Sequence, residues 1–414
     1  MTSEPQQVFV WIWLPGATEP VVAGRLDPVG PLVDFTYGRS YLQRDGAIPL
    51  YLPELPLEAE QISPRVGPIA GCISDAGPDA WGQRVILNRL TGRADADPLE
   101  LGQLTYLIES GSDRIGALDF QASPTEYLPR SIVHASLDQL AESAELIEKG
   151  MPLPPELELA LLHGSSVGGA RPKALVDDGE TAMIAKFSST TDTYPVVKGE
   201  FLAMELARRA GLDVPPVRLA SAQGRDALLV ERFDRPGGGK RRAMVSALTM
   251  LGLHEASARY GSYATLADQV RARFTEPKAT LRELFSRIVF NILCSNTDDH
   301  PRNHAAFWDG EALSLTPAYD ICPQPRSGGE AAQLMAIGRD GWRMSQVAGC
   351  IERASTYLLS EADAREIVDK QIETIEGEWE EVCELAELGE ASRAAFRSRQ
   401  FLNPYSLQDY ERKN

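Results

Sequence analysis

The clearest hydrophobic pattern in the chain lies between Leu281 and Leu293, where apolar residues recur at three- and four-residue spacing. This period predicts a helix with one buried face. A polar loop, Ser295–His304, follows the helix. Two short apolar runs, His304–Trp308 and Ala312–Thr316, then flank Asp309-Gly310, a dipeptide typical of a two-residue hairpin. The stretch therefore predicts a buried helix, a polar loop and a hairpin that turns the chain back.

Residues 1–145 are predicted to form a separate α+β subdomain. We expect strands at Val8–Leu14, Pro20–Arg25, Leu32–Gly38, Ala47–Leu52 and Arg114–Phe120, with helices at Pro78–Thr91 and Leu99–Ser110. No catalytic constellation is evident here. Asp75, Asp79 and Asp113 lie near glycines and are interpreted as turn and cap residues.

Residues 146–414 are predicted to form one core of two parts, a sheet-rich part to about residue 232 and a helical part from 236. Expected strands and helices are Lys173–Val176, Thr181–Phe187, the helix Val197–Ala210, Val214–Ala220, Ala227–Val230 and a helix beginning at Ser360. Residues 231–235 would link the two parts. A glycine loop with Arg235, Lys240, Arg241 and Arg242 follows, and we interpret it as flexible and solvated.

Composition excludes several classes of function. The net charge of −18 argues against direct nucleic-acid binding by bulk electrostatics. Five scattered cysteines without CxxC spacing favour reduced thiols in a cytoplasm over disulfides or a zinc site. We expect no signal peptide, and Val8–Leu14 is too short to span a membrane.

Two carboxylates and a carboxamide can converge in the first stretch. Asp298 opens the polar loop, Asn303 follows five residues later, and Asp320 comes after the hairpin. Oxygen ligands of this kind suit Mg²⁺ held jointly with nucleotide phosphates. Protein kinases arrange a catalytic Asp and their metal ligands in the same order. Taken alone, the loop is equally well explained as a polar surface turn.

Earlier residues supply the other parts of a kinase. The Gly- and Ser-rich segment 163–173 precedes the strand pair, and Lys186 sits in an apolar strand, where a lone cation needs a partner or an anion. Glu200 lies in the first turn of the next helix, as in the kinase ion pair that aims a lysine at the phosphates. The backbone of Glu231–Arg235 would contact adenine. The ordered set predicts an α+β, two-lobed protein-kinase-like fold.

Three segments resemble the HipA family of serine/threonine kinases, the toxin components of HipBA-type toxin–antitoxin pairs. Ser165–Lys173 resembles the phosphate loop, Asn296–Asn303 the catalytic loop and Ala318–Ile321 the metal-binding segment of that family. Pro78–Trp81 and Gly111–Ala117 are similar to segments of its N-terminal subdomain.

The resemblance implies a role for each matching residue. Asp298 would be the catalytic base, and Asn303 with Asp320 would hold Mg²⁺. The remaining roles concern ATP and its loop. Glu200 would form the supporting ion pair with Lys186, and Ser166 or its neighbour Ser165 would be autophosphorylated. The ATP contacts would be Ser166, Val167, Gly168, Gly169, Lys186, Glu231, Phe233, His300 and Asp320. A phosphate on that loop would compete with ATP by charge and occupancy, silencing the kinase.

The resemblance also implies partners: a HipB-like DNA-binding antitoxin, DNA only through that antitoxin, and a translation-related protein substrate such as an aminoacyl-tRNA synthetase. Asp299 departs from the family's best-known member, which has Gly there. Arg171-Pro172 and Val245–Thr249 depart as well, and they leave the substrate open. Two other functions remain open: a small-molecule kinase of aminoglycoside-phosphotransferase type, and a non-catalytic co-repressor acting with the antitoxin.

Overall fold

The computed structural model describes residues 5–92, 97, 101–130, 135–151, 153, 171–177, 181–326 and 329–412. The chain forms two compact units. The first comprises Met1–Thr191, Ala220–Val245 and Phe307–Glu311, and the second comprises Asp192–Leu219, Ser246–Ala306 and Ala312–Asn414. Helices and antiparallel sheets occur together, which confirms the predicted α+β class. The predicted subdomain boundary near residue 145 stays a prediction.

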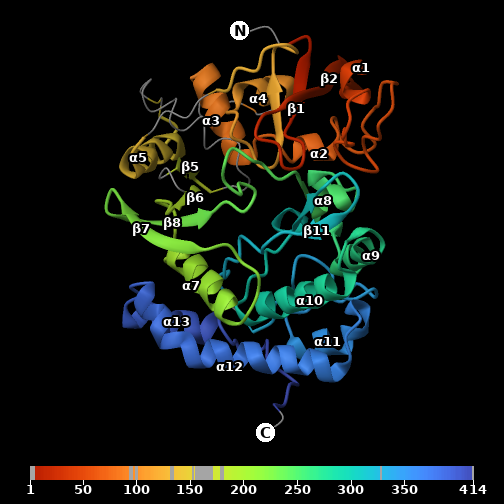
Figure 1. The fold of residues 1–414 in the computed structure, drawn as a ribbon. Coiled ribbons are helices and arrows are strands. Elements are labelled where there is room, and N and C mark those ends of the chain that lie inside the picture. Colours follow the sequence, from red (N-terminus) through yellow and green to blue (C-terminus); the bar gives the residue numbers. More distant parts are fainter. Residues whose placement is uncertain are drawn as a thin grey trace. The chain divides into compact units, whose positions relative to one another are not determined.

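The first unit begins with a four-stranded antiparallel sheet of order β3-β2-β1-β4 (Figure 1). Its strands are β1 (Val8–Ile12), β2 (Val21–Val29), β3 (Leu32–Tyr37) and β4 (Leu118–Gln121). The strand predicted at Ala47–Leu52 was wrong, because only Tyr51 makes an isolated bridge, to Leu55. Pro49 and Pro53 stand at this run, and proline cannot donate a ladder hydrogen bond.

The first unit contains five helices among its described residues, and capping residues mark both ends of α3. The five helices are α1 (Arg39–Leu42), α2 (Gly71–Ser74), α3 (Ala80–Thr91), α4 (Gln103–Glu109) and α5 (Leu137–Glu148). Asp79 caps α3 by accepting a hydrogen bond from the Gly82 N–H at 2.8 Å, which confirms its predicted role. Gly92 ends the same helix in the left-handed conformation (φ 63°).

A second four-stranded sheet has the order β5-β6-β8-β7. Its strands are β5 (Lys173–Asp177), β6 (Ala182–Phe187), β7 (Val217–Ala222) and β8 (Arg225–Glu231). Trp81 and Val85 of α3 and a row of apolar residues of α5 form one buried cluster with Met183 and Phe187 of β6. The helix α5 lies beside β5 and β6 (Figure 1), so α3 and α5 provide the core against this sheet.

Short strands and helices make up the remainder. The strands β9 (Met244–Ser246), β10 (Ala305–Trp308) and β11 (Leu313–Leu315) form a sheet of order β11-β10-β9. The helices are α7 (Val196–Arg209), α8 (Ala247–Met250), η3 (Glu255–Tyr260), α9 (Tyr263–Arg273), α10 (Pro277–Leu293), η4 (Pro301–Asn303), α11 (Val347–Glu352), η5 (Ala354–Tyr357), α12 (Glu361–Leu385) and α13 (Glu390–Arg399).

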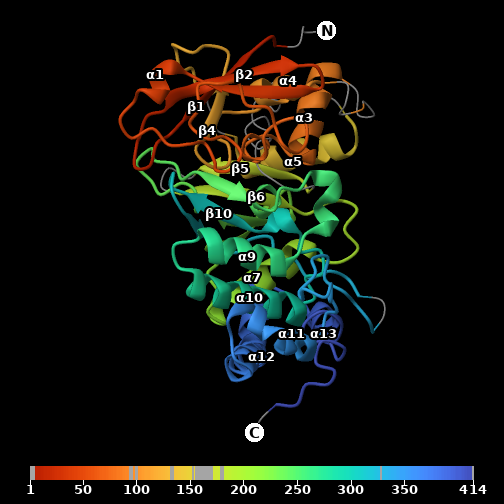
Figure 2. The ribbon, with the colours of Figure 1, turned by 90° about the vertical axis from the view of Figure 1, so that its right-hand side faces the viewer.

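The second unit is built on the long helix α12, which runs below α10 in both views (Figures 1 and 2). Helix α7 also packs on α12, and Arg209 joins the two by ion pairs to Glu378 and Glu381. Gly199 of α7 permits close approach of the Phe396 ring, since a Cβ there would lie 2.9 Å from it. None of the helices in the described part of the chain is both long and apolar enough to cross a membrane.

Candidate active site

The polar loop begins at a defined helix end. Helix α10 has the buried face that its sequence period predicts. At its C-terminus the Asn296 N–H donates to the Asn291 carbonyl at 2.8 Å, and the Ser295 N–H donates to the Ile292 carbonyl at 3.3 Å. This pair of bonds is a Schellman motif. Ser295 takes the left-handed position normally given to glycine (φ 59°).

Ser295 has a compensating contact for this conformation, which costs a non-glycine residue on the order of 1–2 kcal/mol. Its side chain is fully buried, and its hydroxyl donates to the Gln400 carbonyl at 2.6 Å. The Gln324 N–H in turn donates to the Ser295 carbonyl at 2.9 Å. The start of the loop is thus held from two distant parts of the second unit.

The Asp298 carboxyl is partly exposed in this loop, with His300 and Asp320 close enough to change its ionisation. Partial burial raises the pKa of the Asp298 carboxyl, His300 opposes this effect, and the neighbouring charges of Asp320 and Asp299 raise the pKa further. The structure therefore brings the predicted base and one predicted metal ligand into electrostatic reach of each other.

The two predicted metal ligands stand on short, well-anchored segments. Asn303 ends η4, is 7% exposed, and donates its backbone N–H to the His300 carbonyl at 2.8 Å. Asp320 follows the β10–β11 hairpin with φ 61°, a conformation that Asp tolerates better than most residues. The adjacent Tyr319 hydroxyl donates to the Arg302 carbonyl at 2.7 Å, which joins the two segments.

These residues fit a magnesium ion held with a nucleotide. The close charges of Asp298 and Asp320 oppose each other, and a divalent cation would relieve that repulsion. Within the described residues, no group of three or more His, Cys, Asp or Glu forms an all-protein metal site. Magnesium usually needs only one or two carboxylates because phosphates and water complete its shell.

His300 is half-buried, and its Nδ1 atom is buried without a hydrogen-bond partner among the described residues. The following residues are fixed: Arg302 forms an ion pair with Glu255, and Pro301 packs so closely on Gly261 that no Cβ would fit there. The imidazole therefore stands on a rigid segment, with an unsatisfied nitrogen.

The sequence did not predict the buried cluster around Asp299. It showed Asp299 only as a difference from the best-known member of the HipA family. The Asp299 carboxylate is 2% exposed and accepts hydrogen bonds from the Tyr263 hydroxyl, from Asn291 Nδ2 at 2.9 Å and from His304 Nε2 at 2.7 Å. Because a carboxylate only accepts, His304 Nε2 must carry the proton. Burial and the adjacent Asp299 charge raise the pKa of Tyr263 well above its usual value. The only sequence signal was the Asp298-Asp299 doublet.

The segment after Asp320 is attached to the same loop. The Leu334 N–H donates to the Thr297 carbonyl at 3.1 Å, one residue before Asp298. Farther along, Ala332 and Met344 form an antiparallel bridge, so residues 332–344 fold back as a hairpin.

The first unit carries the other predicted residues. Lys186 is half-buried in β6 and is the register partner of Lys173 in β5, so two lysines stand opposite each other on one face of the sheet. Like charges in such positions repel. Asp79 pairs with Lys173 at 2.9 Å and removes that conflict, a second role for this capping residue. The predicted residues Ser165, Ser166, Val167, Gly168 and Gly169 lie outside the described residues.

The predicted hinge residues follow β8. Glu231 is exposed, while Phe233 is half-buried and packs edge-on against Phe307 with centroids 5.9 Å apart. The interpretation of the next segment as a flexible, solvated basic loop was wrong for Arg235 and Arg241, whereas Lys240 and Arg242 are exposed. Arg235 pairs with Asp113 and Asp234, and the guanidiniums of Arg241 and Arg242 cover the Trp13 and Phe307 rings. Asp113, which was predicted to be a turn or cap residue, therefore also forms ion pairs.

Glu200 is 3% exposed near the start of α7, a helix of the second unit, and the predicted apolar face of α7 is buried. The predicted Lys186–Glu200 ion pair joins residues of different units and stays a prediction.

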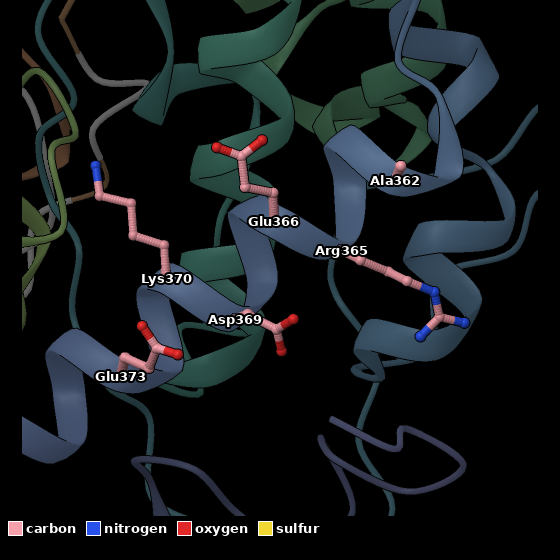
Figure 3. Close-up of a pocket in the computed structure, with 6 residues that line it drawn as sticks. All are labelled: Ala362, Arg365, Glu366, Asp369, Lys370 and Glu373. Atoms are coloured by element: carbon pink, nitrogen blue, oxygen red, sulfur yellow. The ribbon is translucent and has the colours of Figure 1, made fainter. Parts of the chain in front are cut away.

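One surface hollow lies along α12 and is lined by Ala362, Arg365, Glu366, Asp369, Lys370 and Glu373. In Figure 3 these side chains spread outward from one helix and do not converge on a common point. Arg365 already donates to Glu361 at 2.9 Å, and Asp369 accepts from the Tyr410 hydroxyl at 2.6 Å. The hollow is a solvated helix face.

Comparison with known proteins shows the family of this chain. The family described as the HipA-like C-terminal domain matches residues 165–379, more than half of the chain. The chain therefore belongs to the HipA family.

Its relatives carry kinase names. The chain is 26% identical over 349 residues to "Putative kinase Y4mE" of Sinorhizobium fredii, covering 75% of this chain and 79% of that protein. It is 28% identical over 183 residues to "Serine/threonine-protein kinase toxin HipA" of Shewanella oneidensis, covering 38% of this chain and 42% of that protein.

A solved structure agrees in fold. HipA of Shewanella oneidensis, in a complex with HipB and operator DNA, matches with a TM-score of 0.66 at 21% identity, over 94% of this chain and 93% of that one. The predicted HipA-like fold is confirmed.

Proposed function

We propose that the protein is an ATP- and Mg²⁺-dependent serine/threonine protein kinase that acts as the growth-inhibiting toxin of a toxin–antitoxin pair. One observation carries the proposal: in a chain of the HipA family, Asp298 stands within electrostatic reach of Asp320 on a loop that also holds Asn303. A positioned base beside oxygen ligands is the arrangement that phosphoryl transfer requires.

In the proposed reaction, the bond between the γ-phosphorus and the bridging oxygen of ATP breaks, and a new bond forms to a serine or threonine hydroxyl. Asp298 accepts the proton of that hydroxyl, and ADP leaves. Asn303 and Asp320 would hold Mg²⁺, which neutralises charge on the phosphates when bound. His300, with its unsatisfied Nδ1, is oriented by the anchored loop and would contact the phosphates.

The first unit would bind the rest of the nucleotide. Lys186 would contact the phosphates, supported by Glu200, and the backbone of Glu231 and Phe233 would contact adenine. The loop residues 166–169 would cover the phosphates. Phosphorylation of Ser166 or Ser165 would place a dianion there and compete with ATP.

The proposed partners follow from the family. The Shewanella relative is solved with HipB and operator DNA, which supports a HipB-like antitoxin for this chain. At a net charge of −18, DNA contact would be indirect, through that antitoxin. The acceptor would be a translation-related protein, such as an aminoacyl-tRNA synthetase.

Transfer of labelled phosphate from ATP in the presence of Mg²⁺ tests the proposal, using dephosphorylated protein and a bacterial lysate as acceptor. Asp298→Asn should lower transfer by about 10²–10⁴-fold, the usual contribution of a general base. Glu366→Gln, which changes an exposed carboxylate of α12 in the same unit, is the control and should transfer normally.

Three outcomes would contradict the proposal. The wild-type protein could show neither self-labelling nor transfer to lysate proteins. Transfer to a small alcohol such as an aminoglycoside, without protein labelling, would indicate a small-molecule kinase. Growth inhibition that survives Asp298→Asn would indicate a non-catalytic co-repressor.

A further inference from the structure

A loop of the N-terminal subdomain, residues 112–117, binds the proposed hinge inside the first unit. Two hinge arginines, Arg232 and Arg235, donate to the backbone of this loop. Arg232 Nη2 donates to the Arg114 carbonyl at 2.7 Å, and Arg235 Nη1 donates to the Gly116 carbonyl at 2.9 Å. Some 118 residues separate the bonded partners along the chain, so this contact exists only in the folded unit.

Asp113 is the centre of the side-chain contacts. One carboxylate oxygen lies 2.9 Å from Arg232 Nη1, and the other accepts from Arg235 Nη2 at 2.7 Å and from Arg235 Nε at 3.0 Å. The Arg232 side chain is fully buried, and that of Asp113 is 22% exposed. Burial alone would raise the pKa of Asp113, but the guanidiniums of Arg232 and Arg235 bring it well below its usual value.

Asp234 completes the contact from the hinge side. Its carboxylate accepts from the Gly116 N–H at 2.8 Å and from both guanidiniums, at 2.9 Å from Arg232 and 2.8 Å from Arg235. Two carboxylates and two guanidiniums thus form a buried network that is neutral overall. Buried charges are tolerated when they are paired and hydrogen-bonded in this way.

The network fixes the hinge backbone on both sides of Phe233. The Arg232 N–H donates to the Ala182 carbonyl at 2.9 Å, and the Arg242 N–H donates to the Asp234 carbonyl at 3.0 Å. Phe233 lies between the two network residues Arg232 and Asp234, and its ring packs on Phe307. The backbone groups of residues 231–233 therefore have little freedom to rotate.

We propose that Asp113 is a positioning residue for adenine recognition: it acts through Arg232 and Arg235 to hold the backbone of Glu231 and Phe233 in the orientation that binds the base. The inference rests on the proposed ATP-dependent activity and adds to it a role for the N-terminal subdomain. Pre-organised groups bind more tightly because no ordering cost is left for the binding step.

A purely structural role would have a different consequence. Loss of Asp113 would then lower thermal stability and weaken every ligand of the site alike. Positioning of the hinge predicts selectivity, since ATP uses the hinge and the phosphate residues, whereas tripolyphosphate uses the phosphate residues alone. The ratio of the two affinities therefore separates the roles.

The test measures Mg²⁺-dependent binding of ATP and of inorganic tripolyphosphate by calorimetry, with the full chain. Asp113→Asn should weaken ATP binding by about tenfold, which corresponds to about 1.4 kcal/mol, and leave tripolyphosphate binding within about twofold. Glu109→Gln is the matched control, because Glu109 is a carboxylate of the same unit with 29% side-chain exposure and its ion-pair partner is Arg89 of α3. It should change neither affinity.

Arg235→Lys provides a second variant if Asp113→Asn fails to fold, since it keeps the charge but loses the two-pronged contact. The same selective loss for ATP supports the proposal. Equal loss of both ligands, or an ATP affinity equal to that of Glu109→Gln, overturns it. A wild-type protein that binds no ATP would instead refute the proposed function, so the two failures are distinguishable.

Discussion

Replacing Asp299 by alanine removes a buried carboxylate from the loop that carries Asp298. Tyr263, Asn291 and His304 all direct a polar hydrogen at this group, and their exposures are 0%, 4% and 3%. None of these hydrogens could reach water after the change without rearrangement. The variant therefore leaves three buried donors without a partner.

The cost can be worked from these contacts. A buried donor left unsatisfied costs about 1–3 kcal/mol, and neighbouring losses are not additive. We expect Asp299→Ala to lower the free energy of unfolding of the second unit by about 3–5 kcal/mol. Tyr263→Phe removes one donor and keeps the acceptor, so it should cost only about 1 kcal/mol.

Urea unfolding followed by fluorescence measures these changes, and phosphate transfer at saturating ATP measures the effect on the loop. Asp298 and His300 flank Asp299, so a displaced loop should lower transfer even under conditions where the variant remains folded. The control is Asp369→Ala, which removes a half-buried carboxylate that binds the Tyr410 hydroxyl at 2.6 Å. It should cost about 1 kcal/mol or less and leave transfer unchanged.

The reasoning would be refuted if Asp299→Ala unfolded within about 0.5 kcal/mol of the wild type, the range of ordinary surface substitutions. It would also fail if Asp369→Ala were equally destabilising, because burial of the donors would then not determine the cost.

Two further predictions concern packing and pH. Gly377→Ala, in an open part of α12, should stabilise the protein by about 0.5–1 kcal/mol. Gly199→Ala should destabilise it by about 1–3 kcal/mol, because the new Cβ would contact the Phe396 ring. Thermal unfolding of both variants tests this contrast. The pKa of Asp113 is lower in the folded protein than in the unfolded chain, where it is about 3.9. The ionised Asp113 therefore stabilises the fold at pH values above the unfolded pKa, and this stabilisation is lost as the pH falls through the folded pKa. The stability difference between wild type and Asp113→Asn should therefore shrink from pH 5 to pH 2, and a constant difference would contradict this.

Much of the candidate site could be predicted from sequence because it is local. Asp298 and Asn303 are five residues apart on one loop, and the Asp309-Gly310 turn returns the chain toward Asp320. The apolar period of α10 and the capping residue of α3 are likewise local signals. Such features depend on near neighbours, which the sequence displays directly.

The failures have a common cause. Ala47–Leu52 has the apolar character of a strand, but it contains Pro49, is followed by Pro53 and makes only the isolated bridge from Tyr51 to Leu55. The basic loop after residue 234 looked solvated because its partners, Trp13, Asp113 and Phe307, come from distant segments. Asp299 gave no sign of burial because its three donors come from α9, α10 and the end of the loop.

The sequence by itself determined the order of the parts: the glycine-rich segment, the strand lysine, the helix glutamate, the predicted hinge, and the loop with Asp298, Asn303 and Asp320. Tertiary structure alone decided which charges support them. Asp113 meets Arg232 and Asp299 meets Tyr263 because folding transfers these groups from water to the protein interior. An unpaired charge is costly in the interior, whereas a paired and hydrogen-bonded charge is tolerated there. Pairing of this kind depends on distance in space, and separation along the chain carries no record of it.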